Sequence, residues 1–182
     1  NSWTPKNYLD TFNGEVTLTK AFSESLNIPA VKISEIVGRT SVSELGNKFG
    51  LFSNPNNGPA IALGTSEATL LDLVGAYATI LNQGTRIEPF GWKKLQLEKN
   101  KNETLMIKSE RSNMKIINAE TAKDLIFMMS EVTKNGTGKR AKFPDWEVAG
   151  KTGTSQSARD AWFIGFSKYY IAGVWMGYDN NT

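Results

Sequence analysis

The sequence predicts a single domain of the α+β class, and two observations support this prediction. Residues 146–155, 161–166 and 169–176 are rich in aromatic and β-branched side chains and are joined by short polar turns, which is typical of an antiparallel meander. Further upstream, residues 65–82 and 118–133 carry apolar side chains at helical spacing. The chain has 182 residues without an internal repeat or linker, so we expect one domain with its own hydrophobic core.

The first third of the chain combines loops with short helices. Residues 1–13 are polar and loop-like, and residues 51–59 are turn-rich around the stretch NPNNGP. Three helices are expected between these loops: residues 15–25, 30–37 and 41–49. Pro29 suits the first turn of the second helix, and Ser41, followed by a glutamate three residues later, predicts the N-cap of the third. A glycine follows the second and third helices and is expected to end each of them.

The middle of the chain contains the two longest helix predictions and a hairpin between them. The helix over residues 65–82 is expected to be capped by Ser66. Residues 92–107 alternate between apolar and polar side chains, which predicts a β-hairpin with its turn at residues 100–102. The second long helix is expected to start at Asn118, because asparagine is a favourable N-cap.

Composition excludes several kinds of chemistry within these residues. The chain has no cysteine and no histidine, so its own residues form neither a disulfide nor a Ser-His-Asp triad, and we expect no metal or cofactor. Any acid–base chemistry must then use Lys, Asp, Glu or Tyr. The formal net charge of +3 is too small to indicate a nucleic-acid partner. No apolar run approaches the ~20 residues that a membrane-spanning helix needs.

The most informative motif lies on the first predicted strand of the meander, at Lys151, Thr152, Gly153 and Thr154. It offers a cation, two hydroxyl groups and a backbone that a ligand can approach closely, because Gly153 has no side chain. Such a strand is suited to holding a carboxylate or a carbonyl group. Ser155 lies one step beyond the motif and is expected to line the same cleft. The alternative interpretation is an edge strand with a protective lysine.

Two other motifs accompany this strand in a definite order. Ser25 and Asn27, in the stretch Ser-Leu-Asn, place a hydroxyl and an amide on a loop between helices, and Gly136 and Thr137 precede the strand. S-x-N followed by K-T-G resembles the second and third motifs of the penicilloyl-serine transferases, which are the penicillin-binding proteins and the serine β-lactamases. The surrounding stretches SLNIPAVKI, GTGKRA, AGKTGTS and RDAWFIGF look like the class A penicillin-binding proteins, which are bifunctional murein synthases.

This resemblance covers essentially the whole chain and implies a partial transpeptidase domain over residues 1–182, with an antiparallel sheet flanked by helices and an adjoining all-helical cluster. It implies an acyl transfer in which a serine attacks the carbonyl between the two terminal D-alanines of a peptidoglycan stem peptide. D-Alanine leaves, and an amine of a neighbouring stem peptide resolves the acyl-enzyme. β-Lactams would acylate the same serine. The enzyme would be held at the cytoplasmic membrane by an upstream anchor and face the periplasm or the cell exterior.

The resemblance also implies roles for the motif residues. Ser25 would relay a proton to the leaving nitrogen, Asn27 would hold the peptide amide of the substrate, and Lys151 would keep the cleft positive. The backbone N–H that follows K-T-G would be one oxyanion donor. The carboxylate site and the walls of the cleft would come from the remaining motif residues: Thr152, Gly153, Thr154, Ser155, Gly136 and Thr137.

One family motif departs from the expected pattern. S-x-x-K supplies the acylated serine and its lysine and should lie a few dozen residues before Ser25, so we expect both residues to be absent from this chain. A formal match exists at Ser112 and Lys115, but it follows S-x-N in a polar stretch and is not expected to be the nucleophile. The fragment is therefore expected to be incomplete at both ends and inactive without the upstream segment of its own chain. The alternative function is a non-catalytic penicillin-binding sensor or scaffold of the same fold.

Overall fold

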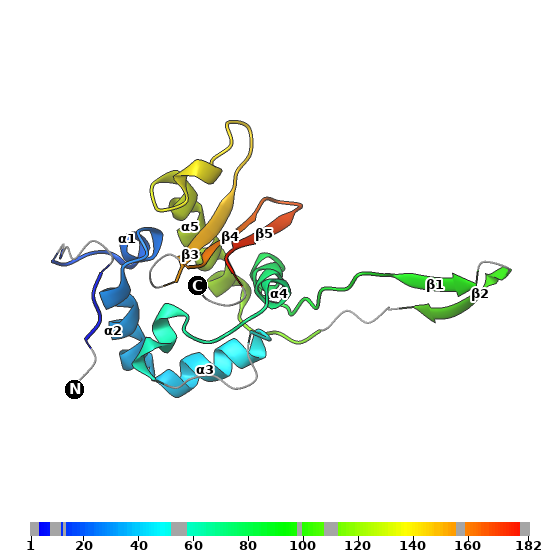
Figure 1. Ribbon diagram of the computed structural model, residues 1–182, viewed down its shortest axis with the longest axis horizontal. Helices are drawn as coiled ribbons and strands as arrows, with labels where there is room; N and C mark the ends of the chain where they lie inside the picture. Colours follow the sequence, from blue (N-terminus) through cyan, green and yellow to red (C-terminus); the bar gives the residue numbers. More distant parts are fainter. Residues whose placement is uncertain are drawn as a thin grey trace.

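The computed structural model describes residues 4–7, 12, 14–51, 58–97, 100–107, 113–155 and 159–178. The helices in this part of the chain are α1 (Leu18–Ser23), α2 (Asn27–Val37), α3 (Arg39–Lys48), η1 (Pro59–Leu63), α4 (Leu70–Leu81), α5 (Ala119–Lys134) and η2 (Lys139–Ala141). Its strands are β1 (Lys94–Leu97), β2 (Asn100–Ile107), β3 (Ala149–Thr154), β4 (Ala161–Phe166) and β5 (Ile171–Met176). Helices α4 and α5 lie against the β3–β5 sheet (Figure 1), and the predicted α+β class is confirmed.

The predicted antiparallel meander is formed by β3, β4 and β5, hydrogen-bonded in that order. Thr152 pairs with Phe163, which pairs in turn with Val174, and the register continues on both sides of this row. The turn between β4 and β5 closes where the N–H of Ser167 donates to the carbonyl of Tyr170 at 2.9 Å. Among the described strands, β3 therefore has a neighbour on one side only, and its other backbone edge is open to a ligand.

Helices α4 and α5 anchor the sheet through its hydrophobic core. A buried cluster joins Ile80 of α4, Met129 of α5, Ala149 of β3 and Phe166 of β4. The ring of Tyr77 packs edge-on against Phe166, with ring centroids 6.4 Å apart. Each fully buried apolar side chain of this kind contributes about 1.5–3 kcal/mol to the free energy of unfolding. The core therefore holds β3 rigidly at the position where the K-T-G motif begins.

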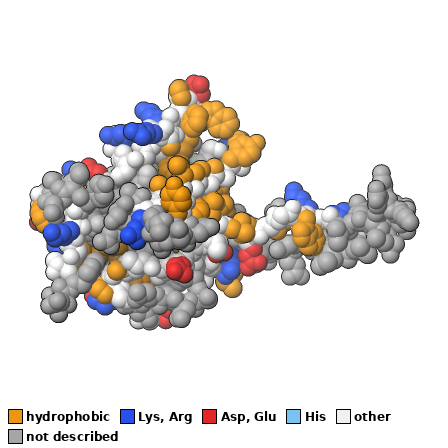
Figure 2. Space-filling model, in the orientation of Figure 1, with side chains coloured by type: hydrophobic (Ala, Val, Ile, Leu, Met, Phe, Trp, Pro, Cys, Tyr) orange, Lys and Arg blue, Asp and Glu red, His pale blue; other side chains and the backbone are white. Residues whose placement is uncertain are grey.

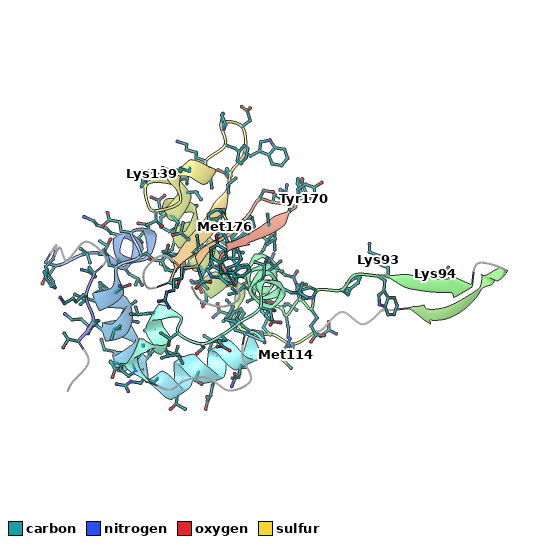
Figure 3. All side chains as sticks on the ribbon, viewed as in Figure 1. Lys93, Lys94, Met114, Lys139, Tyr170 and Met176 are labelled. Carbon is teal, nitrogen blue, oxygen red and sulfur yellow. The ribbon has the colours of Figure 1, made fainter. Side chains whose placement is uncertain are left out.

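An apolar cavity of about 400 Å³ lies beside β4 and β5. Its walls include Phe143 and Trp146 from the segment before β3, Phe163 of β4, and Tyr170. Hydrophobic side chains gather on the upper part of the molecule in Figure 2, and Tyr170 lies there in Figure 3. The lining includes none of the predicted site residues, so this cavity is separate from the predicted cleft.

Two further parts complete the described structure. Helices α2 and α3 pack with η1 as an all-helical cluster below the sheet in Figure 1. Strands β1 and β2 form an antiparallel arm that projects from the body, and Lys93 and Lys94 lie at its base in Figure 3. In the part of the chain that the structure describes, no helix is both long and apolar enough to cross a membrane.

Two predicted N-caps and one predicted turn are wrong. Ser41 lies inside α3, because the helix starts directly after Gly38, which has φ 89° and serves both as the end of α2 and as the N-cap of α3. Ser66 does not cap α4; Thr69 does, and its side chain accepts a hydrogen bond from an N–H of the first turn. Residues 100–102, the predicted turn of the hairpin, belong to β2, and the connection between the strands lies outside the described residues.

The other helix predictions agree with the structure within a few residues. Helix α5 starts after Asn118, whose side-chain oxygen accepts the N–H of Thr121 at 2.7 Å, as predicted. Helix α1 lies within the range predicted for it, and α2 begins three residues before its predicted start. The loop predicted over residues 51–59 lies mostly outside the described residues, and its last residue is already part of η1.

Candidate active site

The centre of the candidate site is a hydrogen bond between two motifs that are far apart in the sequence. Nζ of Lys151 donates to Oγ of Ser25 at 2.6 Å, across 126 residues of chain. Lys151 projects from β3, and Ser25 lies in the turn that follows α1. The turn gives Ser25 a left-handed φ of 57°, and the N–H of Leu26 donates to the carbonyl of Ala21 at 2.9 Å. This conformation is uncommon for a residue with a side chain and turns the hydroxyl toward the sheet.

The surroundings of Lys151 change its acid–base behaviour. Its ammonium group also donates to the carbonyl of Thr152 at 3.0 Å and lies 5.8 Å from the centre of the Phe22 ring. Burial lowers the pKa of Lys151 from 10.5 to about 8. A lysine with this pKa can hold an anion when protonated and can exchange a proton with a neighbouring hydroxyl near neutral pH.

The turn after α5 brings a second hydroxyl pair into the site. Oγ1 of Thr137 lies 2.5 Å from Oγ1 of Thr152 on β3, so one hydroxyl donates to the other. The N–H of Thr137 donates to the carbonyl of Ser23 at 3.1 Å, which joins this turn to the end of α1. Gly136 lies against the backbone of Ser23 so closely that a Cβ at this position would overlap its carbonyl oxygen. The three motifs therefore meet where α1, the turn after α5 and β3 converge.

Asn27, which was predicted on a loop between helices, is instead the first residue of α2, two residues after Ser25. Its side-chain Nδ2 donates to the carbonyl of Lys6 at 2.9 Å, and the N–H of Ile28 donates to Oδ1 of Asn7 at 3.3 Å. Leu26, the N-cap residue of α2, makes no side-chain cap bond, so Asn7 supplies a cap from 21 residues upstream. Asn27 is thus held by the segment 4–7 and does not join the bonded group of Ser25 and Lys151.

The remaining residues of the motif follow the free edge of β3 to its end. Gly153 pairs with Trp162, and a Cβ at Gly153 would lie 3.2 Å from Cβ of Trp162. Thr154 is exposed and is the last residue of the strand. The Oγ of Ser155 accepts a hydrogen bond from the N–H of Asp160 at 2.8 Å, so this side chain is bonded to the residue that precedes β4.

Two contacts in this region were not predicted from the sequence. The indole Nε1 of Trp175 donates to Oδ1 of Asp160 at 3.0 Å, and the ring of Phe22 lies beside the Lys151 ammonium group. The position of Asp160 before an aromatic strand gives no indication of a hydrogen-bond partner 15 residues later.

The structure describes only the lysine of the formal S-x-x-K match. Ser112 lies outside the described residues. Nζ of Lys115 donates to the carbonyl of Gln83 at 2.7 Å, and Lys115 forms an isolated β-bridge with Thr85. Lys115 is therefore used to join the segment before α5 to the end of α4.

Taken together, the site offers one cation of lowered pKa, several hydroxyl groups and an open strand edge. A strand edge can bind an extended peptide through its backbone, and the cation with its neighbouring hydroxyls can bind the carboxylate at the end of that peptide. The hydrogen-bonded pair of Ser25 and Lys151 can move a proton to or from a group bound beside it. These groups suit the binding of a peptide with a free carboxyl terminus and the transfer of a proton beside it.

Comparison with known proteins agrees with this description. The family model for the penicillin binding protein transpeptidase domain matches residues 1–181. Penicillin-binding protein 1A of Aquifex aeolicus (strain VF5) is 40% identical over 177 residues, which are 97% of this chain and 24% of that protein. Penicillin-binding protein 1B of Haemophilus influenzae is 31% identical over 183 residues, with 98% of this chain and 23% of that protein covered. The chain thus spans about a quarter of the length of these relatives.

Solved structures resemble the whole described architecture. Penicillin-binding protein 1A from Haemophilus influenzae superposes with a TM-score of 0.88 at 24% identity, covering 98% of this chain and 32% of that one. The imipenem acyl-enzyme complex of penicillin-binding protein A from M. tuberculosis gives a TM-score of 0.83 at 21% identity, covering 97% of this chain and 46% of that one. At these identities the likeness establishes a shared fold.

Proposed function

Because the chain belongs to the penicillin-binding protein transpeptidase family, we propose that it supplies the substrate-binding side of a serine D,D-transpeptidase active site. The observation that carries this proposal is the 2.6 Å hydrogen bond between Lys151 and Ser25. It brings together the K-T-G and S-x-N motifs, which belong to one signature set.

The proposed reaction is an acyl transfer. A serine from a segment outside residues 1–182 attacks the carbonyl between the two terminal D-alanines of a peptidoglycan stem peptide. The peptide bond breaks, the leaving amine takes a proton, and the stem peptide remains as an ester on the serine. An amine of a neighbouring stem peptide then attacks this ester, which restores the serine hydroxyl and forms the cross-link.

Ser25 and Lys151 are suited to the proton transfer in this reaction. The Ser25 hydroxyl accepts from the Lys151 ammonium group and can pass a proton to the leaving nitrogen as the peptide bond breaks. The pKa of about 8 at Lys151 lets the lysine replace that proton near neutral pH. Positioned acid–base catalysis of this kind typically contributes about 10²–10⁴-fold to the rate.

The open edge of β3 is suited to binding the terminal carboxylate and the backbone of the substrate. The hydroxyls of Thr152 and Thr154 would bind the terminal carboxylate beside the positive charge of Lys151. The absence of a side chain at Gly153 would allow the substrate backbone to approach. The N–H of Thr154 would donate to the oxyanion of the tetrahedral intermediate, and loss of one such donor typically costs about 2.7–4 kcal/mol in the transition state.

The remaining motif residues would shape the cleft. Thr137 is bonded to Thr152 and to the end of α1 and would form one wall of the cleft. The absence of a side chain at Gly136 allows this turn to pack closely against the backbone of Ser23. Asn27 would hold the peptide amide of the substrate. Ser155 would line the far end of the cleft while its Oγ keeps its bond to the turn.

The complete protein would be a class A penicillin-binding protein, with a glycosyltransferase domain and a membrane anchor outside these residues. Relatives named penicillin-binding protein 1A and 1B, of which this chain spans about a quarter, support this proposal. Such an enzyme would act at the outer side of the cytoplasmic membrane on peptidoglycan stem peptides. Penicillin-binding protein A from M. tuberculosis, which shares this fold, has been solved as an imipenem acyl-enzyme complex. This complex supports β-lactams as ligands of the site.

Intact mass spectrometry of the full-length protein with benzylpenicillin tests this function. We expect a mass increase of one drug molecule, and we expect peptide mapping to place it on a serine outside residues 1–182. Labelling of Ser112 would overturn the assignment of the nucleophile, and the absence of labelling would contradict the proposal as a whole. Stable labelling without cross-linking of stem peptides would indicate the sensor function instead.

A further inference from the structure

Asp160 lies directly before β4 and connects this strand to β5. Its Oδ1 accepts a hydrogen bond from the indole Nε1 of Trp175 at 3.0 Å. Hydrogen bonds from the side chains of Ser155 and Trp175 hold the pKa of Asp160 below its ordinary value, so the acceptor is a carboxylate at neutral pH. The bond therefore ties the start of β4 to the far strand of the sheet through a charged acceptor.

The backbone of Asp160 is also bonded to the residue that follows the motif strand. The N–H of Ser155 donates to the carbonyl of Asp160 at 3.1 Å, and the N–H of Asp160 donates to Oγ of Ser155 at 2.8 Å. These two bonds extend the β3–β4 ladder by one step beyond the pair of Thr154 and Ala161. Asp160 is therefore hydrogen-bonded through its backbone to the residue after β3 and through its side chain to Trp175 of β5.

The indole of Trp175 reaches the motif strand through a second contact. Trp175 pairs with Trp162 across β4 and β5, and the two ring centroids lie 5.9 Å apart. Trp162 pairs with Gly153, where the nearest heavy atom to an added Cβ would be Cβ of Trp162 itself. Two tryptophans in series thus link the Asp160 carboxylate to the backbone of Gly153.

We propose that Asp160 is a positioning residue of the transpeptidase site, which fixes the backbone of Gly153 and Thr154 through Ser155 and Trp175. This inference rests on the proposed role of the Thr154 N–H as an oxyanion donor. Such a donor must be held within roughly 0.5 Å of its productive position. Displacement of the donor destabilises the transition state more than it destabilises the initial complex. The acylation rate constant should therefore change, and the affinity of the initial complex should not.

Stopped-flow acylation of the full-length protein by a β-lactam separates these two steps. Asp160→Ala and Trp175→Phe should each lower the first-order acylation rate constant about tenfold or more, with little change in the dissociation constant of the initial complex. The double variant should be no slower than the worse single variant, because both changes remove the same hydrogen bond. Asp160→Asn keeps an oxygen acceptor for the indole and should recover most of the rate.

Asp124→Ala is the matched control, because Asp124 is an exposed aspartate on α5. It should leave the acylation rate unchanged. The inference is overturned if Asp160→Ala acylates as fast as the unsubstituted protein, or if Asp160→Asn is as slow as Asp160→Ala.

Amide hydrogen exchange of residues 149–155 keeps the inference testable apart from the proposed function. Asp160→Ala should speed exchange in this strand while peptides from α5 keep their protection, and unchanged exchange in the strand would overturn the inference. If the unsubstituted protein is not acylated at all, the proposed function fails, and the exchange data still decide whether Asp160 positions the strand.

Discussion

The ammonium nitrogen of Lys151 lies 2.6 Å from the hydroxyl oxygen of Ser25, which precedes it by 126 residues. This pair joins the edge of the sheet to the turn after α1, and in the proposed reaction it is where the proton moves. Its geometry depends on a left-handed backbone at Ser25 and on the partial burial of Lys151. Each of these conditions can be changed by a single substitution.

Ser25→Gly should remove the hydroxyl without straining the turn. The φ of 57° at this position suits glycine, whereas alanine in the left-handed region costs about 1–2 kcal/mol. Ser25→Gly should therefore be at least as stable to urea as Ser25→Ala. Both variants should acylate about a hundredfold more slowly than the unsubstituted protein. A normal acylation rate in the glycine variant would show that the hydroxyl has no part in proton transfer.

The affinity of the site for a ligand carboxylate should fall as the pH rises above about 8, where Lys151 loses its proton. Below that pH the lysine is charged and attracts the carboxylate; above it, the charged fraction decreases about tenfold per pH unit. The dissociation constant of the initial β-lactam complex, measured between pH 6 and 10, should therefore increase above about pH 8. Lys151→Arg should remove the rise, because guanidinium stays charged throughout. An identical profile in both proteins would assign the titration to another group.

Thr137→Val should lower the free energy of unfolding, because it removes one partner of the hydroxyl pair with Thr152. A double-mutant cycle with Thr152→Val should give a coupling of about 0.5–1.5 kcal/mol in urea unfolding. Thr152→Ser keeps a hydroxyl, so Thr137→Val should cost as much free energy of unfolding in the Thr152→Ser protein as in the unsubstituted protein. Strictly additive effects would mean that the two hydroxyls do not support each other.

Gly136→Ala should destabilise the fold by about 3 kcal/mol, because the new methyl group would overlap the carbonyl oxygen of Ser23. The expected result is a lower urea midpoint together with slower acylation, since this contact also positions Thr137. Gly91→Ala is the control, because no heavy atom lies within 4 Å of a Cβ there. A Gly136 variant as stable as the control would show that the turn after α5 can move away from α1.

The sheet and the longest helix could be predicted because local patterns determine them. β4 agrees with its prediction at both ends, since aromatic and β-branched residues continue through the strand and polar residues flank it. Helix α5 starts where Asn118 predicts it, because a capping side chain acts on N–H groups three residues away. The match to the transpeptidase family over residues 1–181 likewise confirms the resemblance inferred from S-x-N and K-T-G.

The errors have two causes, which are competition between neighbouring capping residues and contacts with residues far away in the sequence. Ser41 and Ser66 are good caps by residue type, but a glycine with positive φ and Thr69 start these helices instead. The partner of Asp160 could not be predicted, since the bond to Trp175 depends on the register of two strand pairs. The cap that Asn7 gives to α2 depends on where the chain upstream passes. The roles of the motif residues in catalysis remain predictions.

The arm formed by β1 and β2 also has a practical consequence. It projects away from the sheet and from the meeting point of the three motifs (Figure 1). Its two strands contact each other far more than they contact the rest of the described structure. A fluorescent or affinity tag inserted between β1 and β2 would therefore label the protein in a cell or on a surface while leaving the cleft free for its ligands.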